Sequence, residues 1–386
     1  MKIQTTLLVL LTLAACRAHR REAAPRKSAA PAPQAALAAP ANTAPSPELD
    51  VADDWTALTA LDVGTTGVWT VEVIDLLPQC GGPEAIALDD LGRCHVLIQY
   101  ATRWTDFVAC NDGTWLGGIA HGDLDPRVTG VELYVGAKSG HVYQVVPTPE
   151  GTMDQRLIAD LRGQEVHTLL AVGDELLAFT TPGSLWRLKA SASNVRFDAR
   201  ESEATLGRVR DAELLPDGRM ALATRAGELL LRGPEEGARA EVVLRVASGL
   251  GRVARGANGV LYATTDDGVV WRCEPTSAGW QNERIYVGPP GLRGIAVGHF
   301  SEPAPREELA VFGYSARVEL LARADDGAWS ARTVFSDRDK GHWLAAGEFD
   351  ERNSTDELLG SGYGGRVFVL ARPAGYGRSG AAVSRP

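Results

Sequence analysis

Two stretches of the chain, residues 293–321 and 342–370, align without a gap at an offset of 49 residues. The matched positions are Gly298 with Gly347, Phe300 with Phe349, Glu308-Leu309 with Glu357-Leu358, and Gly313-Tyr314 with Gly362-Tyr363. A third copy, in which Gly122 and Glu132 take the same places, fits at an offset of 176. A unit that recurs in this way restricts the chain to a repeat architecture.

Each repeat consists of short apolar runs separated by Gly and Asp turns, which is typical of antiparallel strands. A spacing of about 42 to 49 residues accommodates four strands, so the sequence predicts an all-β chain folded as a β-propeller. Seven blades are expected, with six or eight as alternatives. Their predicted starting points are Glu84, Gly117, Val166, Val209, Arg252, Arg293 and His342. The first of these blades shows only three clear strands.

The outermost strand of a blade has its own pattern, a Trp followed five residues later by a β-branched residue. The pattern occurs in residues 279–286 and 328–335, and again in residues 68–75. The last blade ends after three strands, at Arg372-Pro373. The sequence therefore predicts that residues 68–75 supply its fourth strand, which would close the ring and remove the free sheet edges.

The first residues of the chain indicate export. Lys2 and the apolar run that follows have the form of a signal peptide, and the run is too short for a mature membrane span. Leu13-Ala14-Ala15-Cys16 resembles the bacterial lipobox, and the resemblance implies cleavage before Cys16 and lipidation of its thiol. An ordinary secretory signal is the alternative. Arg17 after the cysteine favours the outer membrane of the cell envelope over the inner membrane.

Four segments are predicted along the chain: a signal peptide over residues 1–15, a lipidated cysteine and disordered tether over 16–64, the propeller over 65–373, and a flexible tail over 374–386. The tether is rich in Ala and Pro and cannot bury enough apolar surface to fold. The net charge of −10 argues against nucleic acid as a partner. We expect a monomer whose partners are the membrane, through the lipid, and a protein or a glycan.

The three aligned repeats resemble FG-GAP/VCBS-type propeller repeats, whose loop after the inner strand commonly binds calcium. The resemblance implies calcium ligands at Asp123, Asp125 and Glu132, and equivalent positions at Glu348, Asp350 and Glu357. The middle copy keeps only Glu308.

The loops also depart from the family pattern, because Arg127 and Arg352 occupy the third alternate position, where a calcium loop has an oxygen ligand. A guanidinium can neutralise two carboxylates as an ion pair. Calcium and an ion pair therefore stand as alternatives for these loops, and no other cofactor is expected.

Polar residues near the ends of the inner strands are candidates for one mouth of the central channel. They are His121, His299, Glu348 and Asp350. The motifs of common hydrolases, metalloproteases and nucleotide-binding proteins are absent, so no catalytic residue is assigned.

Two cysteines lie on neighbouring runs that a short turn connects. If these runs pair as a hairpin, Cys94 and Cys110 lie directly opposite each other, within reach of a disulfide bond. Exported proteins meet an oxidising environment. The sequence predicts a disulfide here, and four reduced thiols, including Cys80 and Cys273, are the alternative.

These features together predict a membrane-anchored propeller that binds a protein, a glycan or a small ligand. Two other classes stay open. One is an enzyme, a hydrolase or lyase, that uses His121, Asp123, His299 and Glu348 at the channel mouth. The other is an assembly factor similar in plan to the propeller lipoprotein of the outer-membrane barrel-assembly machinery.

Overall fold

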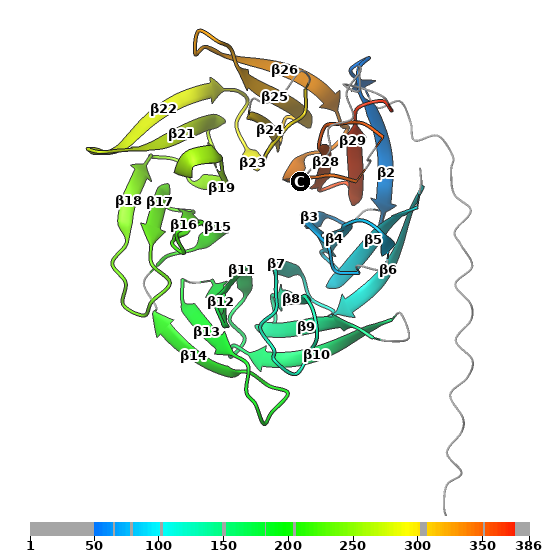
Figure 1. Ribbon diagram of the computed structural model, residues 1–386, viewed down its shortest axis with the longest axis vertical. Coiled ribbons are helices and arrows are strands. Elements are labelled where there is room, and N and C mark those ends of the chain that lie inside the picture. Colours follow the sequence, from blue (N-terminus) through cyan, green and yellow to red (C-terminus); the bar gives the residue numbers. More distant parts are fainter. Residues whose placement is uncertain are drawn as a thin grey trace, which may run out of the picture. The chain divides into compact units, whose positions relative to one another are not determined.

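The computed structural model describes residues 50–374, except for 65, 78–79, 101–102, 149–151, 182, 204–205, 302–306 and 350–351. The described residues form strands joined by loops and turns, among them a short 3-10 turn at Ala257–Gly259. Seven antiparallel sheets stand like blades around a central axis (Figure 1), which confirms the predicted fold and blade number. None of the described segments is a helix long and apolar enough to span a bilayer.

The blades follow the chain order, and the first strand of each, the inner strand, lies nearest the axis (Figure 1). Blades 1 and 2 are β3 (Val68–Ile74), β4 (Glu84–Asp89), β5 (Arg93–Tyr100), β6 (Arg103–Asn111) and β7 (Leu116–Gly122), β8 (Glu132–Ala137), β9 (His141–Pro147), β10 (Met153–Asp160). Blades 3 and 4 are β11 (Val166–Val172), β12 (Glu175–Thr180), β13 (Leu185–Lys189), β14 (Asp198–Glu203) and β15 (Val209–Leu214), β16 (Met220–Thr224), β17 (Glu228–Arg232), β18 (Glu241–Arg245).

Blades 5 and 6 are β19 (Leu250–Arg255), β20 (Leu261–Thr265), β21 (Val269–Thr276), β22 (Gly279–Val287) and β23 (Leu292–Gly298), β24 (Glu308–Gly313), β25 (Arg317–Arg323), β26 (Trp329–Ser336). Blade 7 is β27 (Gly341–Gly347), β28 (Glu357–Gly362), β29 (Arg366–Ala371) and, from the start of the domain, β2 (Thr56–Asp62). The two-residue strand β1 (Asp50–Val51) adds to the outer edge of blade 6.

A strand from the start of the domain closes the ring, as predicted, but the predicted strand was wrong. The strand that pairs with β29 is β2, whereas residues 68–74 form β3, the inner strand of blade 1. Trp55, just before β2, is followed five residues later by Ala60 rather than a β-branched residue, so the pattern of the outer strands missed it. Blade 1 therefore has four strands and begins at Val68, and residues 50–62 belong to the propeller rather than to the tether.

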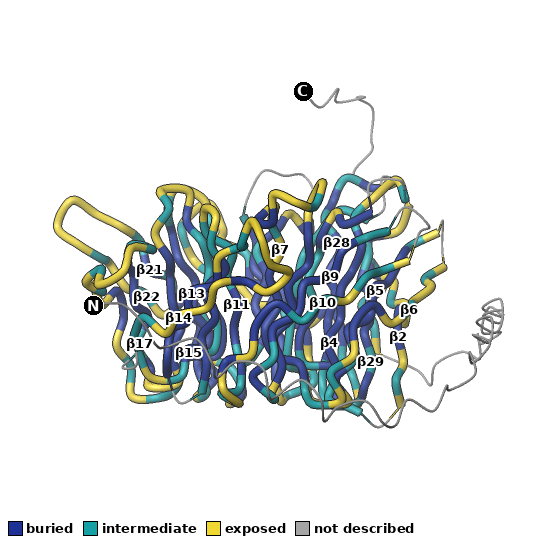
Figure 2. Tube along the Cα trace, turned by 90° about the horizontal axis from the view of Figure 1, so that it is seen from below, coloured by how far each residue is buried: buried dark blue, intermediate teal, exposed yellow. Residues whose placement is uncertain are grey.

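Packing between neighbouring blades forms the core. Figure 2 shows buried positions running through the middle of the blades while the exposed ones gather in the loops at both ends. Between blades 6 and 7, for example, the Phe368 ring lies 5.3 Å from that of Phe312 and 4.5 Å from that of Phe335. Arg372, after the last strand, stacks on Trp55 at 4.3 Å and donates to the Phe300 carbonyl oxygen at 2.8 Å. The two ends of the domain are thereby joined by side chains as well as by the sheet.

Candidate functional site

Four blades carry a long loop between their first and second strands, and in each the second strand begins with a buried glutamate. We call these residues the latch glutamates: Glu84, Glu132, Glu308 and Glu357. Each one accepts a hydrogen bond from the backbone N–H eight residues before it. The donors are Leu76 (2.9 Å), Leu124 (2.9 Å), Phe300 (2.9 Å) and Phe349 (2.6 Å). The repeated glutamate therefore closes the loop by satisfying backbone donors that would otherwise be buried without an acceptor.

The predicted calcium loop of blade 2 is held by an ion pair. The Arg127 guanidinium donates from Nε to Asp125 Oδ1 at 2.7 Å and from Nη2 to Oδ2 at 2.8 Å. These bonds lower the pKa of Asp125 to about 2. Glu132 is the latch of this loop, and Asp123 is exposed. A calcium ion at Asp125 would have to compete with Arg127 for the same two oxygens.

The corresponding loop of blade 7 has a latch of the same kind. Glu357 accepts a second bond from Asn353 Nδ2 at 3.0 Å, while Asp350 lies outside the described residues. Glu348 follows the inner strand directly and is half-buried. Nowhere in the described part of the chain do three His, Cys, Asp or Glu side chains come together as a metal site.

The two candidate histidines lie at the end of the ring where the inner strands finish. His121 is in β7 and His299 follows β23, and both are exposed. His299 lies near Asp356, with Nδ1 3.8 Å from Oδ2. Neither histidine lines the cavity of the channel described below, and they belong to blades 2 and 6 rather than to neighbouring ones.

The other end of the channel carries a feature that was not predicted. All seven inner strands have a β-bulge close to their first residue, where the pairing with the second strand shifts. The bulged residues are Trp69, Gly117, His167, Arg210, the pair Gly251-Arg252, Arg293 and His342. A bulge re-aims side chains and leaves backbone groups unpaired. We call this set the bulge ring.

Aromatic side chains form one side of the bulge ring. The Trp69 ring lies 4.5 Å from that of His342, 4.8 Å from that of Tyr363 and 6.4 Å from that of Trp115. A Cβ atom at Gly117 would collide with the Trp115 indole, which explains why the bulged position of blade 2 is a glycine. His342 Nδ1 lies 2.7 Å from the Trp69 carbonyl oxygen and so links blade 7 to blade 1.

Arginines form the other side of the bulge ring. Arg210 and Arg293 both pair with Asp266, and Arg293 also stacks on Tyr314 at 5.1 Å. Burial and the neighbouring arginines hold the pKa of His342 well below its usual value, so this histidine is neutral at pH 7. The bulge ring is therefore aromatic on one side and cationic on the other.

A cavity of about 310 Å³ lies in the channel beside the bulge ring, and the inner strands of blades 1, 4, 5, 6 and 7 line it. Its charged lining residues are Glu72, Asp211, Glu213, Arg252 and Arg255. Arg252 stacks on Trp343, with its guanidinium carbon 3.9 Å from the ring centre. Burial raises the pKa of Glu72 to about 8, that of Glu213 to about 7 and that of Asp211 to about 6.

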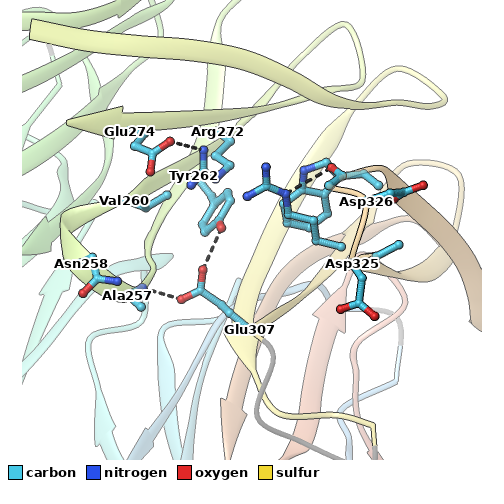
Figure 3. Close-up of a pocket in the computed structure, with 13 residues that line it drawn as sticks. Ala257, Asn258, Val260, Tyr262, Arg272, Glu274, Glu307, Asp325 and Asp326 are labelled. Carbon is cyan, nitrogen blue, oxygen red and sulfur yellow. Dashed lines mark hydrogen bonds and ion pairs between the residues drawn. The ribbon is translucent and has the colours of Figure 1, made fainter. Parts of the chain in front are cut away.

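A larger hollow of about 610 Å³ lies between blades 5 and 6 (Figure 3). Several of its charged groups are already paired within the protein. Tyr262 donates to Glu307 at 2.7 Å, and Arg272 pairs with Glu274 at the same distance. The channel cavity differs because Glu72 accepts no hydrogen bond and forms no ion pair within the described residues. An ionisable side chain with a shifted pKa and no partner in a concave site indicates a ligand, so the channel cavity is the better candidate.

The predicted cysteine pair lies where the sequence placed it. Cys94 and Cys110 are direct partners across β5 and β6, and both side chains are buried. Both are free thiols in the structure. Burial raises the pKa of Cys110 to about 12, which disfavours the reactive thiolate. The register is confirmed, and the disulfide bond stays a prediction.

The sequence analysis missed Glu72 and Trp69 because it placed the start of blade 1 one strand too late. It missed Asp211 and Arg252, on inner strands that it placed correctly, because no local pattern marks them as channel residues. One signal could have found the bulge ring. Most of the bulged residues directly follow a buried Val or Leu at the start of an inner strand, as Trp69 follows Val68 and Arg293 follows Leu292. Aligning the inner strands on this apolar residue puts the bulge ring in one column.

No family model matches the sequence, and no curated protein sequence matches it either. Solved β-propeller structures do match. They include the WD40 propeller domain of Doa1, at 11% identity and a TM-score of 0.60, covering 82% of this chain and 97% of that one. A catalytically inactive virginiamycin B lyase from Staphylococcus aureus with quinupristin is similar at 10% identity and a TM-score of 0.60, covering 83% and 100%. A structure of YCF48 bound to D1 peptide is similar at 12% identity and 0.55, covering 88% and 100%. Likeness at such identities establishes the fold alone.

Proposed function

We propose that this protein is a binding module of the bacterial cell envelope, anchored at the outer membrane, that captures its partner at the central channel. The observation that carries the proposal is the channel cavity, which five inner strands line and which charged side chains from three of them, β3, β15 and β19, face. The partner is a protein, a glycan or a small ligand that reaches the bulge ring.

A rigid frame supports this role. The ring is closed by β2 in blade 7, and each inner strand that carries the bulge ring is hydrogen-bonded to the second strand of its own blade. Groups that are held in place before binding lose little conformational entropy when a partner arrives. Two of the similar propellers are described with a bound molecule, quinupristin in one and a peptide in the other. That likeness is one of fold, and the site itself carries the argument.

The membrane anchor rests on the lipobox resemblance at Cys16, a residue outside the described part of the chain. Lipidation would attach the propeller to the membrane through its N-terminal segment. Replacing Cys16 by Ser should abolish incorporation of labelled palmitate and move the protein to the soluble fraction. Retention of the variant in washed membranes would contradict a lipid anchor.

The capture of a partner is tested by photo-crosslinking in native membranes. A photoreactive residue placed at Tyr314, beside the bulge ring, should yield a defined crosslinked partner. The matched control is Val287, which is 69% exposed at the end of the outer strand β22 of blade 5. The same products at both positions, or none at Tyr314, would contradict capture at the channel. A barrel protein among the products would favour the assembly-factor class.

An enzyme is the second candidate, because two carboxyl groups in the cavity have pKa values near neutrality. Glu72 and Glu213 have pKa values of about 8 and 7, and groups that titrate there suit acid–base catalysis at pH 7. Any hydrolase or lyase activity of the purified protein should then fall at least about 100-fold in E72Q or E213Q. His121→Ala, outside the cavity, is the control, and equal loss in all three variants would contradict catalysis at the cavity.

A further inference from the structure

Arg252, in the channel wall, has a buried guanidinium group whose hydrogen-bonding capacity is only partly used within the described residues. It is only 4% exposed, and its Nη1 donates to the carbonyl oxygens of Arg210 at 3.1 Å and Gly251 at 3.0 Å. Its Nε is buried and has no acceptor among the described residues. A buried N–H without an acceptor is unfavourable, and native proteins rarely leave one. A ligand that accepts from this guanidinium would account for the unused donor.

The same cavity also carries negative charge. Glu72 from β3 and Glu213 from β15 line it, and so does Asp211, whose Oδ2 accepts from the Val253 N–H at 3.0 Å. Glu213 lies 3.7 Å from the Nε of Arg255, and Glu72 has no such partner among the described residues. The Glu72 carboxyl interacts through space with Asp211, Glu213 and Arg252. Acceptors for a cationic or hydroxyl-bearing group are therefore present within the cavity that holds the guanidinium.

The mixture of charges limits the class of ligand. A simple anion would gain from Arg252 but would be repelled by the carboxyl groups that are ionised, and a simple cation would meet the reverse conditions. An ammonium group beside Glu72 or Glu213 would favour the ionised form of that carboxyl group. A ligand that carries one charge of each sign satisfies both sides. Planar guanidinium groups bind carboxylates well, and Trp343, stacked on Arg252, holds the guanidinium plane.

We infer that the channel cavity binds a small zwitterion of the amino-acid or short-peptide class, with its carboxylate at Arg252 and its ammonium group at Glu72 and Glu213. The volume of about 310 Å³ lies at the lower end of the range of small-ligand sites, which is about 300–1,000 Å³. Ile295 and several alanines of the inner strands supply an apolar wall for a side chain. The inference deepens the proposed function, on which it rests, by naming the ligand.

The test is calorimetric titration of the full chain with glycine, L-phenylalanine and L-alanyl-L-alanine, each also in its N-acetylated and its C-amidated form. At least one unmodified probe should bind, and blocking either charge should weaken its binding at least about tenfold, the loss of one charge-assisted interaction. The inference is wrong if no unmodified probe binds, or if both blocked forms bind as well as the parent.

Two variants assign the charges to their partners. E72Q should weaken the unmodified probe but leave the N-acetylated form unchanged, because that form has lost the ammonium group. R252K, which keeps a positive charge but not the fork of donors, should weaken the unmodified probe and leave the C-amidated form unchanged. Both variants are first checked for the native melting curve. A partner crosslinked at Tyr314 together with failure of every zwitterionic probe would overturn this inference and leave the proposed function standing.

Discussion

Truncation of a latch glutamate should destabilise the propeller by a predictable amount. Glu84 is fully buried, and one oxygen, Oε2, accepts from both the Leu76 and the Leu77 N–H at 2.9 Å. E84A removes that oxygen and leaves two donors without their acceptor. Each unsatisfied buried donor costs about 1–3 kcal/mol. Water entering the space left by the carboxyl group recovers part of this, so we expect a loss of about 2–4 kcal/mol in the free energy of unfolding.

The matched control keeps the oxygen and removes only the charge. In E84Q the side-chain carbonyl oxygen can accept from both N–H groups, so the loss should stay below about 1 kcal/mol. A second comparison uses Glu308, for which the described residues show one such bond, from Phe300. E308A should therefore cost about half as much as E84A.

Equilibrium unfolding in urea, followed by tryptophan fluorescence, measures these differences if the slope with denaturant is equal among the variants. The reasoning is refuted if E84A unfolds within about 0.5 kcal/mol of the wild type, since surface substitutions alone reach that size. It is also refuted if E84Q is as destabilised as E84A, because the cost would then come from lost charge rather than from lost acceptors.

Three further predictions concern the channel, the cysteines and the closure. Because burial raises the pKa of Glu72 to about 8 in the folded state, above its ordinary value of 4.5, the folded protein binds this proton more tightly than the unfolded chain. The contribution of this group to the free energy of unfolding is therefore fully present below pH 4.5 and is lost as the pH rises to 8. E72Q should remove this decline, so its free energy of unfolding at pH 8 should be about 1–2 kcal/mol higher than that of the wild type. Urea unfolding of both proteins at pH 5 and pH 8 measures the difference. If Cys94 and Cys110 form a disulfide in the exported protein, the intact mass rises by about 2 Da on reduction; an unchanged mass would show two thiols. R372A removes the stacking on Trp55 and the bond to the Phe300 carbonyl oxygen, so its thermal unfolding should begin at a lower temperature, and an unchanged melting curve would contradict a role of Arg372 in closure.

The repeat predicted the blades well because each blade is a local unit. Strands that follow each other along the chain pair with each other, so turn residues and apolar runs contain the information. The register of Cys94 and Cys110 was correct for the same reason, since a single short hairpin sets it.

Local sequence patterns could not identify the strand that closes the ring. Its partner, β29, lies at the far end of the domain, and the Thr, Ala and Leu residues of β2 resemble the preceding tether in composition. Its buried residues, Ala60 and Leu61, pack against blades 1 and 7, and only the folded ring brings blade 7 beside it. Tertiary contacts therefore determine that residues 56–62, rather than residues 68–75, form the closing strand.

The predicted site shows the same division. The family resemblance implied that Asp125 and Glu132 are calcium ligands, and this stays a prediction; in the structure Asp125 pairs with Arg127 and Glu132 accepts from backbone N–H groups. The residues of the channel cavity come from five blades and are far apart in the sequence.

The sequence by itself determined the architecture, because four strands and their turns recur within each repeat and interact mainly with their neighbours along the chain. The tertiary structure alone decided which strand closes the ring and which charged groups share the channel. The physical reason is that burial and electrostatic interaction depend on distance in space. Glu72 and Arg252 belong to blades 1 and 5, and only the closed ring places them in one cavity.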